Sequence, residues 1–146
     1  MDYQLTLRII LEKPPAGIDF GLQSGNGNNY TTVQRQRSGL NDLSFELEIK
    51  VKKTVEGKPN FLGPYAQGPI DERFVYIDIG TYAGNSHSVW GRRLKVPLKS
   101  ISWADIEQAI ANGNKILETR VPGTGRDGGP NCATVKPFDG WYLKDI

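Results

Sequence analysis

The sequence predicts a mainly β domain, an antiparallel two-sheet sandwich or an open barrel, with one connecting helix near residues 102–112. Three observations support this prediction. Apolar and polar residues alternate along several runs of the chain. The 17 glycines and 9 prolines gather between those runs, where short strands would turn. One segment alone shows helical spacing and a capping signal. Of the two architectures we favour the sandwich.

The first half of the chain contains four extended runs that are separated by turn signals. They cover residues 3–12, 18–22, 30–37 and 43–53. The last run alternates most cleanly, because every second residue from Leu43 to Val51 is apolar. Successive side chains of a strand point to opposite faces, so each run predicts one buried face. Together with the run at 73–81, the apolar positions of these runs predict a buried core. It includes Leu5, Leu7, Ile9, Phe45, Leu47, Ile49, Val75 and Ile77.

The second half begins after a long loop at residues 56–68. The run at 73–81 is apolar on both faces, which is typical of a central strand that is covered on both sides. Asp78 is therefore unusual there. In the next run, at 89–98, Arg92 shares the predicted inward face with Leu94.

A single helix follows, and two short strands complete the chain. Ser102 is a suitable N-cap, Asp105 stands three residues later, and Ile106 and Ala109 have helical spacing. The pair at 112–113, Asn-Gly, ends the helix. The strands are predicted at 116–121 and 134–143.

Length and composition limit the class of protein. A chain of 146 residues fits one domain, residues 1–146. The net charge of +2 is spread over interspersed signs, so no nucleic-acid partner is expected. No apolar run reaches about 18 residues, so no membrane span is expected. Cys132 is the one cysteine, and the chain starts without a leader-like segment, which predicts a cytoplasmic protein.

Four segments together resemble a family of small bacterial single-domain proteins of unknown function. They are FLGPYAQGP at 61–69, RFVYIDIGT at 73–81, RRLKVP at 92–97 and the tail at 121–137. The resemblance runs nearly end to end. It implies a stand-alone domain, and it supplies no activity, substrate or cofactor.

Few residues suggest catalysis. His87 is the one histidine, and an exposed loop position is its simpler interpretation. Cys132 could be a nucleophile, although a lone cysteine is more often a small buried hydrophobe. One His and one Cys would need carboxylates to complete a transition-metal site, so we predict no metal and no cofactor.

Arg92 requires a partner, because an unpaired charge on an apolar face is costly. Asp78 or Asp127 could supply it. The pair would be either a structural ion pair or an anion clamp at a pocket mouth. The amide and guanidinium groups at 34–37 could contact phosphates or sugars, but a solvated strand is the simpler interpretation.

The glycines at 123, 125 and 128 have the G-x-G-x-x-G spacing of dinucleotide-binding loops. That motif needs a helix directly after the glycines, and Gly129-Pro130 opposes a helix start. We therefore predict a structural loop in which Asp127 bonds nearby amides and Arg126 reaches across a pocket mouth.

These observations favour a small binding module whose loops at 60–69 and 123–131 build a pocket for a small molecule or a peptide. One alternative is a small enzyme that uses His87, Asp78, Arg92 or Cys132. The other is a homo-oligomeric domain that pairs through strand edges. The predicted ligand-binding residues are Phe61, Tyr65, Gln67, Asp78, His87, Arg92, Arg126, Asp127 and Asn131.

Overall fold

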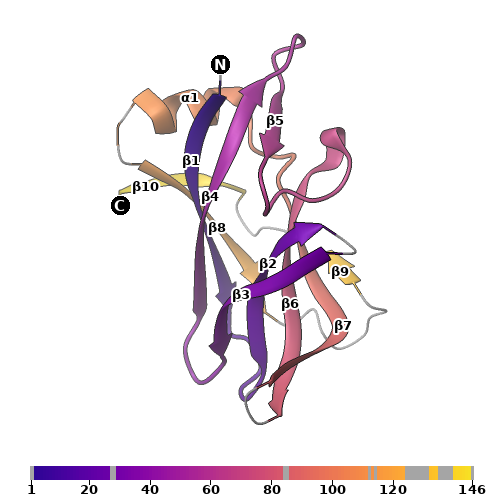
Figure 1. The fold of residues 1–146 in the computed structure, drawn as a ribbon. Helices are drawn as coiled ribbons and strands as arrows, with labels where there is room; N and C mark the ends of the chain where they lie inside the picture. The colour runs from indigo at the N-terminus through magenta and orange to yellow at the C-terminus, as the bar shows by residue number, and fades with distance from the viewer. Residues whose placement is uncertain are drawn as a thin grey trace.

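Two five-stranded sheets form the molecule (Figure 1). The computed structural model describes residues 2–26, 29–83, 86–111, 113, 115–123, 132–134 and 140–145, and of residues 26, 80–83, 86–92, 132–134 and 145 it describes the backbone alone. The strands are β1 (Asp2–Glu12), β2 (Asp19–Asn26), β3 (Asn29–Arg37), β4 (Leu43–Lys53), β5 (Pro59–Leu62), β6 (Phe74–Ala83), β7 (Ser86–Pro97), β8 (Lys115–Pro122), β9 (Cys132–Thr134) and β10 (Tyr142–Asp145); the helices are the 3-10 helix η1 (Ile70–Glu72) and α1 (Trp103–Ala111).

The first sheet has the strand order β10-β8-β1-β4-β5 and the second has the order β3-β2-β6-β7-β9. None of the described strands belongs to both sheets, so the structure is a two-sheet sandwich. Most pairs are antiparallel, but β1 pairs with β8 in parallel, and β7 pairs with β9 in parallel. A parallel pair needs a crossover connection, and the chain between β1 and β8 includes four strands of the second sheet, β2, β3, β6 and β7, and the helix α1.

The core lies between the sheets and contains the residues that alternation predicts. All eight residues of the predicted core are buried, with exposed fractions between 0% and 4%. Cross-strand pairs place them opposite one another, as in Leu7↔Leu47 between β1 and β4. Ile77, in the central strand β6, lies between Leu22 of β2 and Leu94 of β7. The mainly β prediction is thus confirmed.

Helix α1 lies across the end of the first sheet at which β1 begins (Figure 1). Its predicted cap is confirmed, because the Asp105 amide donates to Ser102 Oγ and the Ser102 amide donates to Asp105 Oδ2, both at 3.2 Å. Ile106 and Ala109 are buried and belong to the main core. No helix in the described ranges is long and apolar enough to cross a membrane.

Strand β3 connects the two sheets through its side chains. Strand β5 pairs with β4 only from Lys50 to Lys53, which leaves the first half of β4 without a strand partner on that side. There Gln34 Nε2 donates to the Glu46 carbonyl at 2.6 Å, and Gln36 Nε2 donates to the Ser44 carbonyl at 2.7 Å. These two amides therefore have a structural role.

Candidate functional site

A groove of about 710 Å³ lies between the outer face of the first sheet and the turn that follows β5. One wall is polar and consists of side chains from β1 and β4. The opposite wall contains Leu62, Pro64 and Tyr65. Binding sites for small molecules typically have volumes of about 300–1,000 Å³, so the groove has the size of a ligand site.

The polar wall follows from strand alternation. Gln4 and Thr6 of β1 stand on either side of the buried Leu5, and they pair across the sheet with Lys50 and Glu48 of β4. The opposite wall follows from the turn chemistry. Gly63 has φ = +112°, a conformation that favours glycine, and this sharp turn brings the following residues over β4.

Hydrogen bonds hold the polar groups in place before any ligand arrives. Gln4 Nε2 donates to Glu48 Oε2 at 2.8 Å. Arg8 Nη2 lies 2.6 Å from Glu46 Oε1, and Arg8 Nη1 lies 2.9 Å from Glu118 Oε2. The hydrogen bonds to Glu118 and then to Glu46 raise the pKa of Arg8 above its ordinary value. Glu46 and Glu48, which line the groove, thus each have a hydrogen-bond partner on the neighbouring strand β1.

Of the residues predicted from the 60–69 loop, the groove contains Tyr65. This side chain is partly buried and packs against the core. Phe61 is 2% exposed and belongs to the core cluster. Gln67 is also buried, where its Nε2 donates to the carbonyls of Gly25 and Pro64, the latter at 3.1 Å. Phe61 and Gln67 therefore have packing and loop-fixing roles.

Asp78 is fully buried in the second sheet, away from the groove. Thr32 Oγ1 donates to Asp78 Oδ2 at 2.7 Å, and Arg93 Nε lies 3.4 Å from Asp78 Oδ1. The Thr32 side chain can reach Asp78 across β2 because the residue that lies between them is Gly21, which has no side chain. A Cβ at Gly21 would lie 2.2 Å from Thr32 Cγ2. The residue opposite Asp78 in the register is Arg93, one position beyond the predicted Arg92.

The guanidinium of Arg93 lies between two aromatic rings. Its Cζ is 4.9 Å from the ring centre of Tyr30 and 5.0 Å from that of Tyr76. Burial acts to lower the pKa of Arg93, but hydrogen bonding to Tyr30 and the charge of Asp78 outweigh it and raise the pKa above its ordinary value. The arrangement is a cluster inside the fold in which Arg93 forms an ion pair with Asp78 and lies against two aromatic rings.

The other predicted site residues are outside the described side chains. His87 and Arg92 are in β7, and Cys132 is in β9, where the backbone alone is described. The residues that lie wholly outside the described part are Arg126, Asp127 and Asn131. The prediction that 123–129 is a structural loop therefore stays a prediction beyond its first glycine.

Gly123 itself is buried where β8 ends. Its amide donates to the Glu12 carbonyl at 2.9 Å, and a Cβ there would lie 2.8 Å from Pro14 Cα. This glycine permits a close approach of two backbones. Within the ranges described, no three His, Cys, Asp or Glu side chains are grouped so that they could hold a metal ion.

Sequence reasoning missed most of the groove. Gln4, Thr6 and Glu48 occupy the outward phase of their strands, as do many polar residues that have no role in a site. The sequence does not reveal which part of the sheet lies under the turn at 63–65, because this depends on the pairing of β4 with β5.

Comparison with known proteins identifies a family and no activity. The chain matches the family model DUF5990, described as a family of unknown function, over residues 5–144. No curated protein and no solved structure matches the chain. The match covers nearly the whole sequence, in agreement with the resemblance of its four segments. The chain therefore belongs to the family of unknown function DUF5990.

Proposed function

We propose that this chain is a binding module and that the groove beside Tyr65 takes a small, polar, hydroxyl-rich molecule such as a sugar or polyol. The observation that supports this proposal is the pairing of a hydrogen-bonded polar wall with an apolar wall in one groove of about 710 Å³. The single cysteine of the chain is in keeping with a reducing, cytoplasmic setting for such a protein.

The polar wall suits hydroxyl groups because it combines acceptors with donors. Glu48 offers carboxylate oxygens, Lys50 offers an ammonium group, and Thr6 offers a hydroxyl that both donates and accepts. A sugar has hydroxyl edges and apolar C–H faces. Its edges would meet the strand side chains, while a C–H face would pack on Tyr65 and Pro64.

A small molecule fits this site better than an extended peptide does. A peptide that adds to a sheet edge needs exposed backbone groups. The carbonyls of Ser44 and Glu46, on the open side of β4, already accept hydrogen bonds from Gln36 and Gln34. Strand addition at this position would first have to displace both amides.

The test is a thermal-shift screen with monosaccharides, disaccharides, polyols and short peptides, followed by calorimetric titration of any hit. We expect a sugar or polyol hit whose affinity falls about tenfold or more in Glu48→Ala, because a hydrogen bond to a charged group contributes about 1.5–3 kcal/mol. Tyr65→Ala should also weaken binding. Glu72→Ala removes an exposed carboxylate from η1 and is the matched control, with unchanged affinity.

Hits that bind Glu48→Ala and Tyr65→Ala as well as the parent would place the ligand elsewhere and refute the groove. Binding of peptides alone would refute the hydroxyl-rich class. The unfolding midpoint of each variant without ligand separates a lost contact from a lost fold.

A further inference from the structure

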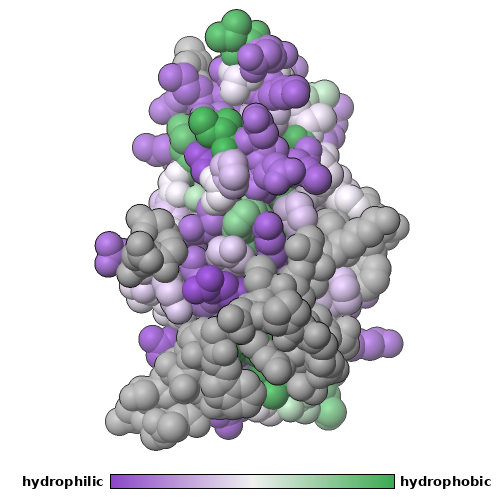
Figure 2. Space-filling model, turned by 90° about the vertical axis from the view of Figure 1, so that its right-hand side faces the viewer, coloured by the Kyte–Doolittle hydropathy of each residue, from purple (hydrophilic) through white to green (hydrophobic). Residues whose placement is uncertain are grey.

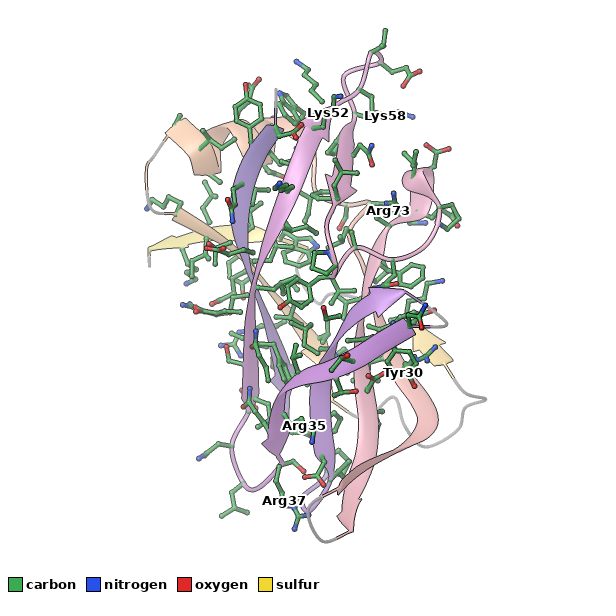
Figure 3. The ribbon with its side chains drawn as sticks, viewed as in Figure 1. Tyr30, Arg35, Arg37, Lys52, Lys58 and Arg73 are labelled. Carbon is green, nitrogen blue, oxygen red and sulfur yellow. The ribbon has the colours of Figure 1, made fainter. Side chains whose placement is uncertain are left out.

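We infer that Arg73, Lys95 and Lys99 form an oxyanion site that takes the phosphate group of a small organic phosphate ester. This site is separate from the groove beside Tyr65, and it does not depend on the function proposed for that groove. Arg73 and Lys58 lie on the same side of the molecule (Figure 3). Figure 2 views that side, and its described surface is largely hydrophilic, with small separate apolar patches.

Arg73 is held rigidly by neutral groups. Its Nε donates to the Phe61 carbonyl at 3.1 Å, and its Nη1 donates to the Gly68 carbonyl. Gly68 has φ = +85°, and a Cβ there would lie 2.4 Å from the Phe74 ring, so glycine is required to present that carbonyl. In the described part of the chain, no carboxylate forms an ion pair with Arg73. The guanidinium is thus fixed in position while its charge is not neutralised.

Two lysines complete the cationic surface. The Leu98 amide donates to the Arg73 carbonyl at 2.9 Å, and this bond places Lys99, the next residue, near Arg73. Lys95 Nζ lies 4.2 Å from the ring centre of Phe74, over the residue that follows Arg73. Neither lysine forms an ion pair with a carboxylate among the described side chains.

The three cations line a common hollow of about 170 Å³. Glu72 is the one acidic residue among the described side chains that line it, so three positive charges and one negative charge leave +2. A water molecule takes about 30 Å³ of liquid, so the hollow has room for a tetrahedral oxyanion. A fixed guanidinium and mobile ammonium groups are the side chains that proteins use for phosphate.

An adjoining groove of about 500 Å³ provides space for the rest of the ligand. Arg73 and Lys99 line both spaces, and the groove adds Lys58, Trp103 and the hydroxyl-bearing Ser102. A phosphate ester could therefore place its phosphate in the hollow and its organic group in the groove, beside the indole ring.

The same groove argues against a nucleic acid. Glu56 and Asp71 line it together with the cations, so the phosphates of a long polyanion would meet carboxylates after the first site. The net charge of the whole chain, +2, adds little long-range attraction. A ligand with one phosphate group suits this distribution of charge.

The test is calorimetric titration at constant ionic strength with inorganic phosphate, phenyl phosphate and phenol. We expect both phosphates to bind, with phenyl phosphate tighter, and phenol alone to bind far more weakly. The double variant Lys95→Gln/Lys99→Gln should lose about tenfold or more in affinity for phenyl phosphate, as expected for lost charge-assisted hydrogen bonds. Lys144→Gln removes an exposed lysine of β10 and should change affinity by less than about twofold.

Three results would overturn the proposal: no phosphate binding, an equal loss in Lys144→Gln, or no loss in the double variant. If a single-stranded oligonucleotide binds more tightly than phenyl phosphate, with a steep salt dependence, the ligand is a nucleic acid and the phosphate-ester proposal is wrong. Arg73→Lys keeps the charge but loses the fork of donors, so it should also weaken binding. Should this variant fail to fold, the lysine variants still decide the outcome.

Discussion

Asp78 places a carboxylate inside the second sheet, where an ionised group is stable only if it has partners. The sequence marks this residue correctly as unusual, because it interrupts a run that is apolar on both faces. Its partners could not be predicted. Thr32 is 46 residues away, and Arg93 lies opposite Asp78 only because of the register between β6 and β7.

Thr32→Val should destabilise the fold by about 1–3 kcal/mol. Valine has nearly the shape of threonine, so the change removes the hydroxyl that donates to buried Asp78 and little else. Urea unfolding measures the difference in free energy. Thr31→Val is the matched control, because Thr31 is the exposed neighbour in the same strand, and it should change stability by less than about 0.5 kcal/mol. Equal effects would refute a special role for the Thr32 hydroxyl.

Tyr142 connects stability to pH. Burial raises the pKa of its phenol, and the charge of Glu118 acts in the same direction. The folded state thus retains a proton that the unfolded state releases near pH 10. The resulting stabilisation is fully present below about pH 10 and is lost as the pH rises through the raised pKa.

The free energy of unfolding should therefore fall more steeply above about pH 10 in the parent chain than in Tyr142→Phe. Denaturant unfolding at a series of pH values measures both curves. Superimposable slopes in this range would show that Tyr142 is not the group responsible.

At the level of elements, β2 and β3 approach each other closely at Gly21. The pairing of the two strands shifts between Phe20 and Leu22, and the Thr32 side chain fills the space above the glycine. Side-chain alternation does not reveal such a contact, because it identifies which face of a strand is buried but not what lies against it.

Gly21→Ala should cost about 1–3 kcal/mol or more, since the added methyl group overlaps Thr32 Cγ2 and displaces the hydroxyl from Asp78. Gly39→Ala is its control, because no atom lies within 4 Å of a Cβ built there. Thermal unfolding of both variants measures the effect. Nonadditivity of Gly21→Ala with Thr32→Val would show that the two changes act on one hydrogen bond.

Alternation predicted the long strands and the helix, because local periodicity follows from burial of one face. It missed the short strand β5, which lies in the predicted loop at 56–68, and it placed the last strand at 134–143, where the described strands are β9 and β10. It could not predict that β8 runs parallel to β1, since parallel and antiparallel neighbours can have the same burial pattern. The candidate groove was predictable only through Tyr65. Its other wall depends on which strand the 63–65 turn covers, and this is a property of tertiary structure.

At the level of the whole molecule, the first sheet depends on contacts between the two ends of the chain. Strand β1 lies between β4 and β8, and Arg8 bonds to Glu118, which is 110 residues away. A chain that ends at residue 113 should therefore lack a cooperative unfolding transition, because it loses the buried residues Leu117 and Val121 and leaves β1 without one partner.

Differential scanning calorimetry provides the measurement. A chain that ends at residue 141 loses only the edge strand β10 and is the control, which we expect to unfold cooperatively at a lower temperature. A cooperative transition in the shorter chain would show that the second sheet and β1–β4 fold without β8.

The glutamine amides that meet β4 also bear on how the protein behaves at high concentration. A row of unsatisfied carbonyls on a strand edge is a template on which a second chain can grow, as in domain-swapped dimers and fibrils. Gln34 and Gln36 occupy that row at Glu46 and Ser44 with donors that belong to the same chain. Replacing the two glutamines with leucine would leave these carbonyls unpaired. The hydrogen bonds from β3 to β4 therefore also protect the protein against aggregation.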